Sequence, residues 1–226
     1  LRQLMDNGEL EIIQNGKVVD STDSRFGIRY IATDPNSGFY LNGVHTKLNG
    51  VCEHSDLGSL GMETYQAAVD RRIRTLKKYG VNAIRTSHNP VSPEFIEACD
   101  RLGMLVFEEA FDQWLYSKNS DDYHNYFNKA ADGKTVVFDK AGNDNTNNDT
   151  SYIEVKRDDL QSNAERDIKA MVDRDKNAPC IFAWSTGNEI YDARYKHGEN
   201  TLDMLTGWIK EIDTTRPVAA CPPTWD

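Results

Sequence analysis

The alternation of apolar and polar residues predicts β-strands at the N-terminal end of the chain. Residues 10–14 and 17–19 flank Asn15-Gly16, and both central residues of a type I′ turn need positive φ, so this stretch predicts a hairpin. Residues 25–31 continue with a period of two. Because one or two hairpins are marginal in water, we expect this region to be the end of a larger sandwich.

The pattern changes after residues 34–38, a polar stretch that we expect to be a linker. Asn42-Gly43 predicts a second hairpin, which leads into a first inner strand that ends near residue 51. Apolar positions spaced for one helical face then predict a helix over 63–79, with Gly80 as its left-handed cap.

Strands and helices alternate from there on. We expect a strand over 81–84 and then a helix that begins at Ser92-Pro93 and ends at Gly103, since Ser is a good N-cap and Pro suits the first helical position. The later elements are a strand over 104–107, a polar insertion over about 117–157, a helix over 158–174, a strand over 180–184, a helix over 199–211 and a strand over 217–221.

This alternation indicates an α/β fold with a parallel sheet and right-handed crossovers. A complete (β/α)₈ barrel needs about 250 residues, whereas the pattern yields five strands and four helices within a chain of 226 residues. We therefore expect a partial TIM (β/α)₈ barrel. Such a half-open barrel exposes strand edges, so we expect the fragment to be weakly stable alone, to associate with itself, or to belong to a longer chain.

Composition excludes some classes of partner. The formal net charge is −10 and the chain has no basic run, which argues against binding to nucleic acid or to anionic membranes. The first residue is Leu1, so we expect the natural N-terminus to lie further upstream, and the compartment cannot be inferred. Four scattered cysteines are expected to be small buried residues; they are Cys52, Cys99, Cys180 and Cys221.

The candidate chemistry follows the apolar strand 180–184. Ser185-Thr186-Gly187 leads directly into Asn188-Glu189. A carboxylate at the C-terminal end of a buried parallel strand lies where α/β barrels carry catalytic groups. The alternative is that Glu189 begins the next helix, where an acid interacts well with the helix dipole.

Six segments follow one another along the chain: residues 25–29, 39–43, 48–58, 82–90, 99–103 and 184–189. Taken together and in this order, they resemble glycoside hydrolase family 2, the β-galactosidase-like enzymes. The resemblance implies that residues 1–36 end an immunoglobulin-like β-sandwich and that residues 37–226 form the N-terminal part of the catalytic barrel. It also implies a retaining β-glycosidase with a carbohydrate substrate, in which Glu189 is the general acid/base. The nucleophilic glutamate of the family ends the seventh strand, which this sequence does not reach.

Among the sugars, the resemblance favours a β-galactosidase. A β-glucuronidase or a β-mannosidase of the same family is the alternative, and an inactive carbohydrate-binding fragment is another. Some relatives bind magnesium near the site, but no His/Glu pair in this sequence has metal spacing, so we expect no metal and no cofactor.

Matched motif positions imply several substrate-binding residues, each with an alternative. Asn188 is expected to hold the sugar 2-hydroxyl, or else to cap the following helix. Arg85 is expected to orient the nucleophile, or else to pair with Glu109 inside the barrel. The remaining candidates are His54 and His88 in the sugar subsite, or in structural roles, and Asn89, a substrate contact or a turn residue.

A further cluster follows the third strand. Glu108 and Glu109 are not expected to be catalytic, because the family position of the nucleophile lies elsewhere. Asp112 is expected to touch substrate. Trp114 begins an aromatic group, with Tyr116, Tyr123 and Tyr126, that suits the apolar faces of sugars; packing of the insertion onto the barrel is the alternative.

Overall fold

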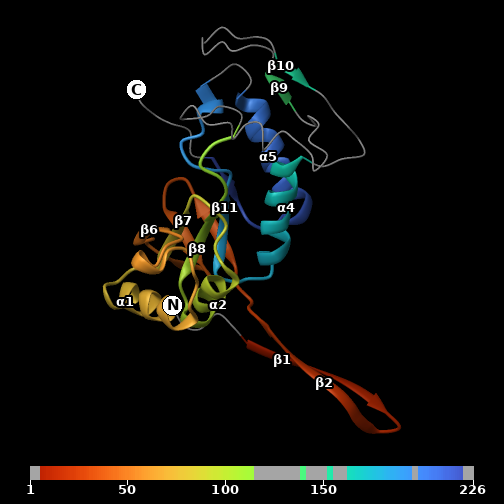
Figure 1. Cartoon of the computed structure of the whole chain (residues 1–226). Coiled ribbons are helices and arrows are strands. Elements are labelled where there is room, and N and C mark those ends of the chain that lie inside the picture. Colours follow the sequence, from red (N-terminus) through yellow and green to blue (C-terminus); the bar gives the residue numbers. More distant parts are fainter. Residues whose placement is uncertain (1–5, 115–137, 141–151, 155–161, 195–197, 221–226) are drawn as a thin grey trace. The chain divides into compact units, whose positions relative to one another are not determined.

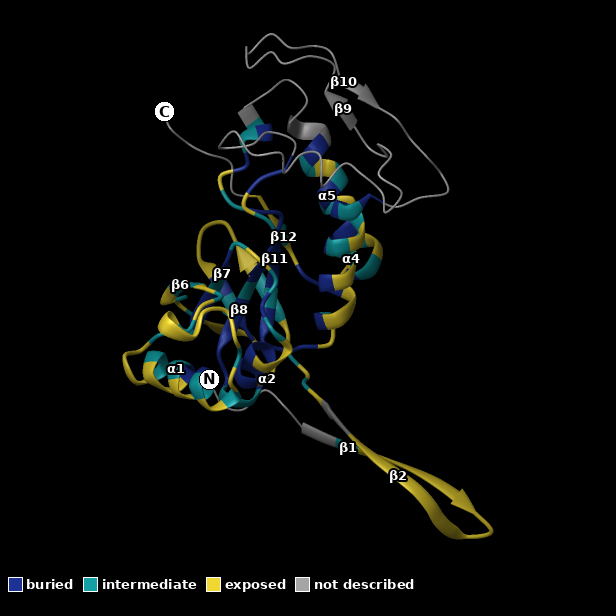
Figure 2. Cartoon of the chain, in the orientation of Figure 1, coloured by how far each residue is buried: buried dark blue, intermediate teal, exposed yellow. Residues whose placement is uncertain are grey.

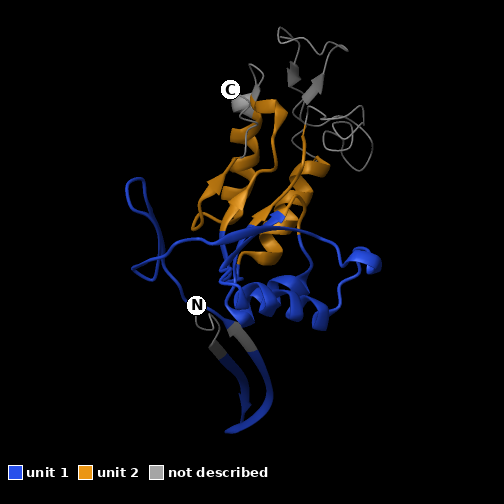
Figure 3. Ribbon diagram, turned by 90° about the vertical axis from the view of Figure 1, so that its left-hand side faces the viewer, with its two compact units in different colours: residues 1–86, 91–107, 177–182 blue, residues 87–90, 108–176, 183–226 orange. Residues whose placement is uncertain are grey.

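A computed structural model describes residues 6–114, 138–140, 152–154, 162–194 and 198–220. The chain divides into two compact units (Figure 3). Unit 1 comprises residues 1–86, 91–107 and 177–182, and unit 2 comprises residues 87–90, 108–176 and 183–226. Each unit is described by itself.

Unit 1 begins with a two-stranded antiparallel ribbon, β1 (Asp6–Gln14) and β2 (Lys17–Phe26). Asn15 and Gly16 have φ of 52° and 73°, which confirms the predicted hairpin turn. The apolar side chains of this ribbon are largely exposed, as Figure 2 shows. The strand predicted over 25–31 is wrong, because β2 ends at Phe26 and the next strand begins only at Ile31.

A three-stranded antiparallel sheet follows, with β3 (Ile31–Asp34), β4 (Gly38–Leu41) and β5 (Val44–His45). Residues 34–38 are the turn of the β3–β4 hairpin and not a linker. The physical reason is local: Asp34 Oδ1 accepts hydrogen bonds from the backbone N–H of Asn36 at 2.9 Å and of Ser37 at 2.7 Å, which holds the chain in a turn. The domain boundary near residue 36 stays a prediction.

The main sheet contains β6 (Gly50–His54), β7 (Ala83–Ser87), β8 (Leu105–Glu109), β11 (Ile181–Ser185) and β12 (Val218–Ala219). Their order is β12-β11-β8-β7-β6, and the pairs β7–β8 and β11–β12 are parallel. Figure 1 labels β6, β7, β8 and β11, and Figure 2 also labels β12. Most residues of β7, β8 and β11 are buried, as expected for strands covered on both faces. The alternation of these strands with helices is consistent with part of an α/β barrel.

Unit 1 supplies two helices that pack together, α1 (Gln66–Lys78) and α2 (Pro93–Leu102). The α2 boundaries confirm the prediction: Ser92 Oγ accepts from the backbone N–H of Phe95, and Gly103 has the left-handed φ of 71°. Helix α1 begins three residues later than predicted, after Tyr65.

Unit 2 supplies α4 (Asn163–Asp175) and α5 (Gly198–Ile212), which also pack together. Lys169 on α4 pairs with Glu165 at 2.6 Å and with Glu211 of α5 at 2.5 Å. Burial lowers the pKa of Lys169, but the hydrogen bonds to the two glutamates more than offset it, so the pKa lies above its usual value. Ile168, Met171 and Val172 are buried, as predicted.

The shorter elements are the 3₁₀ turns η1 (Gly58–Leu60) and η2 (Tyr191–Arg194) and an antiparallel pair, β9 (Phe138–Lys140) and β10 (Tyr152–Glu154). That pair falls within the predicted insertion over 117–157, and the rest of the insertion lies outside the described residues.

A compact apolar cluster in unit 1 joins Phe39 and Leu41 of β4 to Ala83 and Leu105 of the main sheet. Of the cysteines predicted to be buried, Cys99 and Cys180 are buried, but Cys52 is exposed, and Cys221 lies outside the described residues. Within the described part of the chain, none of the helices combines the length and the apolar character that a bilayer crossing requires.

Candidate active site

Glu189 lies in a sharp turn that follows β11. Gly187 and Glu189 both have positive φ, 131° and 45°, and Glu189 is exposed while Ser185, Thr186 and Gly187 are buried. The alternative that Glu189 begins a helix is wrong, because a left-handed residue is incompatible with a right-handed helix and η2 begins only at Tyr191. The turn therefore presents a carboxylate to solvent at the C-terminal end of a parallel strand.

Two hydrogen bonds fix the backbone of this turn to the loop that follows β8. Trp114 Nε1 donates to Thr186 O at 2.6 Å, and the Asn188 backbone N–H donates to Phe111 O at 2.9 Å. Gly187 lies in this contact, and a Cβ there would overlap Phe111 O and approach Trp114 Nε1 to 3.1 Å. The segment from residue 110 to residue 114 is thus the support on which the Asn188-Glu189 turn is built.

The Asn188 side chain makes a third link to the same loop. Its Nδ2 donates to Asp112 Oδ1 at 2.8 Å. Asp112 is exposed and Asn188 is half-buried. The structure therefore brings together three residues that the sequence analysis nominated, Asp112, Asn188 and Glu189.

Strand β11 contains one residue more than its neighbour β8 over the same stretch. Hydrogen bonds run from Val106 N to Cys180 O at 2.8 Å and from Ala110 N to Ser185 O at 3.3 Å, so an interval of four residues on β8 matches five on β11. One extra residue of this kind is a β-bulge, which re-aims the side chains that follow it. Ser185 is one of them, and its Oγ donates to Glu109 Oε2 at 2.7 Å.

Glu108 and Glu109 are adjacent on β8 but contact different partners. Glu109 is fully buried and also lies 2.6 Å from His88 Nδ1, whereas Glu108 Oε1 lies 3.4 Å from Arg174 of α4. Successive side chains on a strand point to opposite faces, which explains why neighbouring glutamates have different partners. Glu109 therefore holds His88 in place from within the protein.

Two further candidates in unit 2 differ in exposure. Asn89 is exposed in the loop after β7, where it can reach a ligand or solvent. Trp114 is only 2 % exposed, and its indole N–H donates a hydrogen bond to Thr186 O. The expectation that Trp114 stacks against a sugar is therefore corrected: its ring packs against the turn that follows β11. Whether the aromatic residues pack the insertion onto the barrel stays a prediction. Tyr116, Tyr123 and Tyr126 lie outside the described residues.

His54 and Arg85 belong to unit 1. His54 ends β6 and is exposed, and Arg85 on β7 lies with its Nη1 3.9 Å from Cys52 Sγ. Whether either residue contacts substrate stays a prediction.

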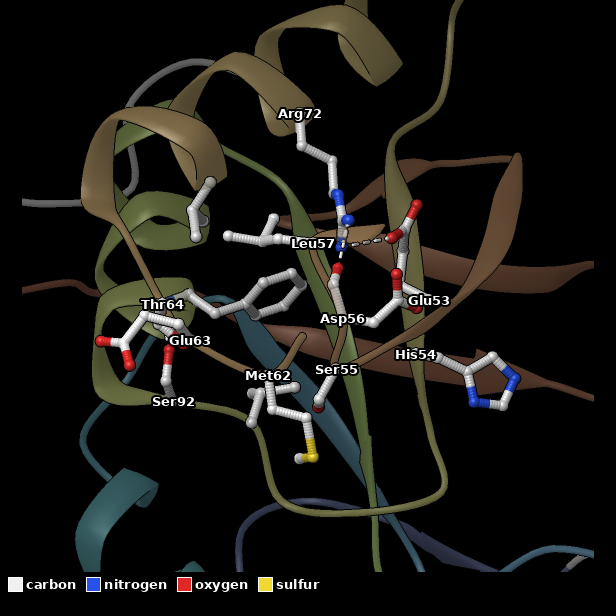
Figure 4. Close-up of a pocket in the computed structure, with 13 residues that line it drawn as sticks. Glu53, His54, Ser55, Asp56, Leu57, Met62, Glu63, Thr64, Arg72 and Ser92 are labelled. Atoms are coloured by element: carbon white, nitrogen blue, oxygen red, sulfur yellow. Dashed lines mark hydrogen bonds and ion pairs between the residues drawn. The ribbon is translucent and has the colours of Figure 1, made fainter. Parts of the chain in front are cut away.

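Unit 1 also contains a small cavity beside the end of β6. Figure 4 shows Arg72 of α1 reaching Glu53, with Nη1 and Oε2 3.0 Å apart. Burial raises the pKa of Glu53, and Arg72 offsets part of that effect. The cavity measures about 40 Å³, whereas pockets for organic ligands run to about 300–1,000 Å³. It can hold water but not a sugar ring.

Sequence reasoning missed two contributions to this site, the Ser185 hydroxyl and the Phe111 carbonyl, and assigned the Trp114 indole a different role. All three act through contacts between loops. Gly187 before Asn188-Glu189 was the available signal, since a glycine in a tight turn often marks a close backbone approach. In the described ranges, no group of three or more His, Cys, Asp or Glu side chains has metal-binding geometry.

Comparison with known proteins identifies the family. Residues 34–222 match the family model described as "Glycosyl hydrolases family 2, TIM barrel domain". A β-galactosidase of Bacteroides ovatus is 33 % identical, in an alignment that covers 93 % of this chain and 24 % of that protein. A β-glucuronidase of Bacteroides fragilis is 24 % identical, covering 93 % of this chain and 26 % of that protein.

The solved structures agree. A glycosyl hydrolase family 2 member from Bacteroides cellulosilyticus superimposes with a TM-score of 0.75 at 37 % identity, over 96 % of this chain and 24 % of that one. The chain thus spans about a quarter of the length of these relatives. It belongs to glycosyl hydrolase family 2, and its sequence matches the TIM barrel domain of that family.

Proposed function

We propose that the protein to which this chain belongs is a retaining β-glycosidase that removes terminal β-linked sugars, with Glu189 as its general acid/base. The observation that carries this proposal is the position of Glu189: exposed, at the C-terminal end of a parallel strand, on a turn that the loop after β8 holds in place. Family membership supports the reaction class, because the relatives are named as glycosidases.

Retaining hydrolysis needs two carboxyl groups about 5–5.5 Å apart. In the first step Glu189 gives its proton to the departing glycosidic oxygen while a second carboxylate attacks the anomeric carbon. In the second step Glu189 takes a proton from water while that water attacks the anomeric carbon and displaces the second carboxylate, which releases the sugar and restores both carboxyl groups. We propose that the second carboxylate lies in a part of the protein that this sequence does not contain.

The neighbouring residues take the roles that the family resemblance implies. Asn188 holds the sugar 2-hydroxyl, a contact that strengthens toward the transition state. In unit 2, His88, fixed by Glu109, and Asn89 are proposed to bind the sugar. In unit 1, the family resemblance implies a substrate contact for His54 and a role for Arg85 in orienting the second carboxylate. Residues 1–36 are proposed to end an immunoglobulin-like sandwich.

We propose β-galactosidase activity first, supported by the 33 % identity to the Bacteroides ovatus β-galactosidase. β-Glucuronidase activity is the second candidate, because the Bacteroides fragilis relative carries that name at 24 % identity. The remaining candidates are β-mannosidase activity and carbohydrate binding without turnover.

Turnover of nitrophenyl β-galactoside, β-glucuronide and β-mannoside by the complete protein separates these candidates. We expect the galactoside to have the highest kcat/KM. Glu189→Gln should lower kcat on it by about 10²–10⁴-fold, because the second step loses its general base. Glu97→Gln is the matched control, since Glu97 is a half-exposed acid on α2 that pairs with Arg101 at 3.5 Å. Absence of turnover on all three sugars, with binding retained, would favour the non-catalytic alternative.

A further inference from the structure

Asp112 and Asn188 come from the loops that follow two neighbouring strands, β8 and β11. Asn188 Nδ2 donates to Asp112 Oδ1 at 2.8 Å, directly beside Glu189 in the chain. Asp112 is therefore the side chain that the structure places against the amide of a residue proposed to bind substrate.

The chemistry of this pair decides which way the Asn188 amide faces. An asparagine carries an acceptor and a donor on one flat group, and a half-turn about its last bond exchanges them. A carboxylate only accepts hydrogen bonds, so Asp112 requires the Asn188 nitrogen to face it and directs Oδ1 elsewhere. A neutral partner such as Asn or Ser tolerates either orientation, because it can both donate and accept.

The backbone of Asn188 is held separately. Its own N–H donates to Phe111 O at 2.9 Å, and Trp114 Nε1 holds Thr186 O two residues earlier at 2.6 Å. Neither contact involves the Asp112 side chain. Removing the Asp112 carboxylate should consequently leave the backbone of the turn in place and remove the constraint that this carboxylate places on the Asn188 amide.

We propose that Asp112 is a positioning residue that acts through Asn188: it locks the amide in the orientation that receives the sugar 2-hydroxyl. This inference rests on the proposed function, in which Asn188 makes that contact. It refines the expectation that Asp112 touches substrate. It also predicts that Asp112 matters only for substrates that carry a 2-hydroxyl group.

The test compares two substrates in the complete protein: the preferred nitrophenyl β-glycoside and its 2-deoxy analogue. Asp112→Asn should lower kcat/KM about tenfold on the 2-hydroxy substrate, the scale of one misplaced hydrogen bond. On the 2-deoxy substrate the change should stay within about twofold. In an Asn188→Ala background, Asp112→Asn should cost nothing further on either substrate, because the two residues act as one unit.

Asp173→Asn is the matched control. This aspartate lies on α4, its side chain is 67 % exposed and it pairs with Lys176 at 2.5 Å, so its loss should change neither kcat/KM nor the melting temperature. Asp112→Ser is the second variant if Asp112→Asn folds poorly.

Equal losses on the two substrates after Asp112→Asn would overturn the inference, and so would failure of both Asp112 variants to fold, since the residue would then be structural. A different result would contradict the proposed function itself, and not only the role of Asp112. If Asn188→Ala lost equal activity on both substrates, Asn188 would not contact the 2-hydroxyl group, whatever Asp112 does.

Discussion

Glu109 Oε1 lies 2.6 Å from His88 Nδ1, and this contact ties the end of β8 to the loop after β7. The second oxygen of Glu109 accepts from Ser185 Oγ of β11 at 2.7 Å. One buried carboxylate thus fixes side chains from two neighbouring strand ends.

Loss of this carboxylate should cost stability as well as activity. Glu109→Ala removes the carboxylate that accepts from the buried Ser185 hydroxyl and contacts the half-buried His88 ring, so we expect the free energy of unfolding to fall by about 3 kcal/mol. Glu109→Gln keeps one acceptor oxygen and should cost about 1–2 kcal/mol. Urea denaturation monitored by circular dichroism measures both, with the half-exposed Glu97→Gln as the control. An Ala variant as stable as the wild type would show that Glu109 does not hold the two strand ends.

Gly187→Ala should disturb the turn that presents Glu189. The added methyl group overlaps Phe111 O and φ is 131°, so we expect a loss of about 1–3 kcal/mol together with reduced turnover. Gly207→Ala is the matched control: Gly207 lies within α5 with nothing within 4 Å of an added Cβ. That change should raise stability by up to about 1 kcal/mol. Equal melting temperatures for the two variants would contradict the packing described for Gly187.

Asp213 should make the stability of unit 2 depend on pH. It accepts hydrogen bonds from Trp184 Nε1 at 2.8 Å, Thr215 Oγ1 at 2.6 Å and Arg216 Nη1 at 2.6 Å. Burial raises the pKa of Asp213, but the hydrogen bonds from Thr215, Trp184 and Arg216 more than offset this and hold the pKa well below its usual value.

The sign of the pH effect follows from that shift. The unfolded state binds the proton more readily than the folded state, so the contribution of Asp213 is complete above its unfolded pKa of about 4 and is lost as the pH falls below it. Wild type should exceed Asp213→Asn in unfolding free energy by a constant amount from pH 6 to 8, and the gap should shrink below about pH 4. A gap that widened on acidification would contradict the assignment.

Local sequence signals predicted most of the elements, because their causes are local. Asn15-Gly16 and Asn42-Gly43 adopt the positive φ values that their turns need, and Ser92 and Gly103 cap α2 as expected. The turn at Asp34 was mistaken for a linker because Pro35, Asn36 and Gly38 are common to both.

The candidate site was predictable as a set of residues but not as a network. Asn188-Glu189 after an apolar strand pointed to a carboxylate at a strand end, and the structure has it there. The burial of Trp114 and the Asp112–Asn188 contact depend on how two loops meet. The bulge in β11 likewise appears only in the pairing with β8, since hydrophobic periodicity does not reveal one extra residue.

The central claim is that Glu189 delivers a proton to a departing sugar oxygen, and leaving-group dependence tests it most directly. In the complete protein, kcat/KM of Glu189→Ala is compared on a methyl β-glycoside, whose leaving group needs a proton, and on a dinitrophenyl β-glycoside, whose leaving group does not. We predict a loss of about 10²–10⁴-fold on the methyl glycoside and less than about tenfold on the dinitrophenyl glycoside. Equal losses on the two substrates, or wild-type turnover of the methyl glycoside, would contradict the role assigned to Glu189.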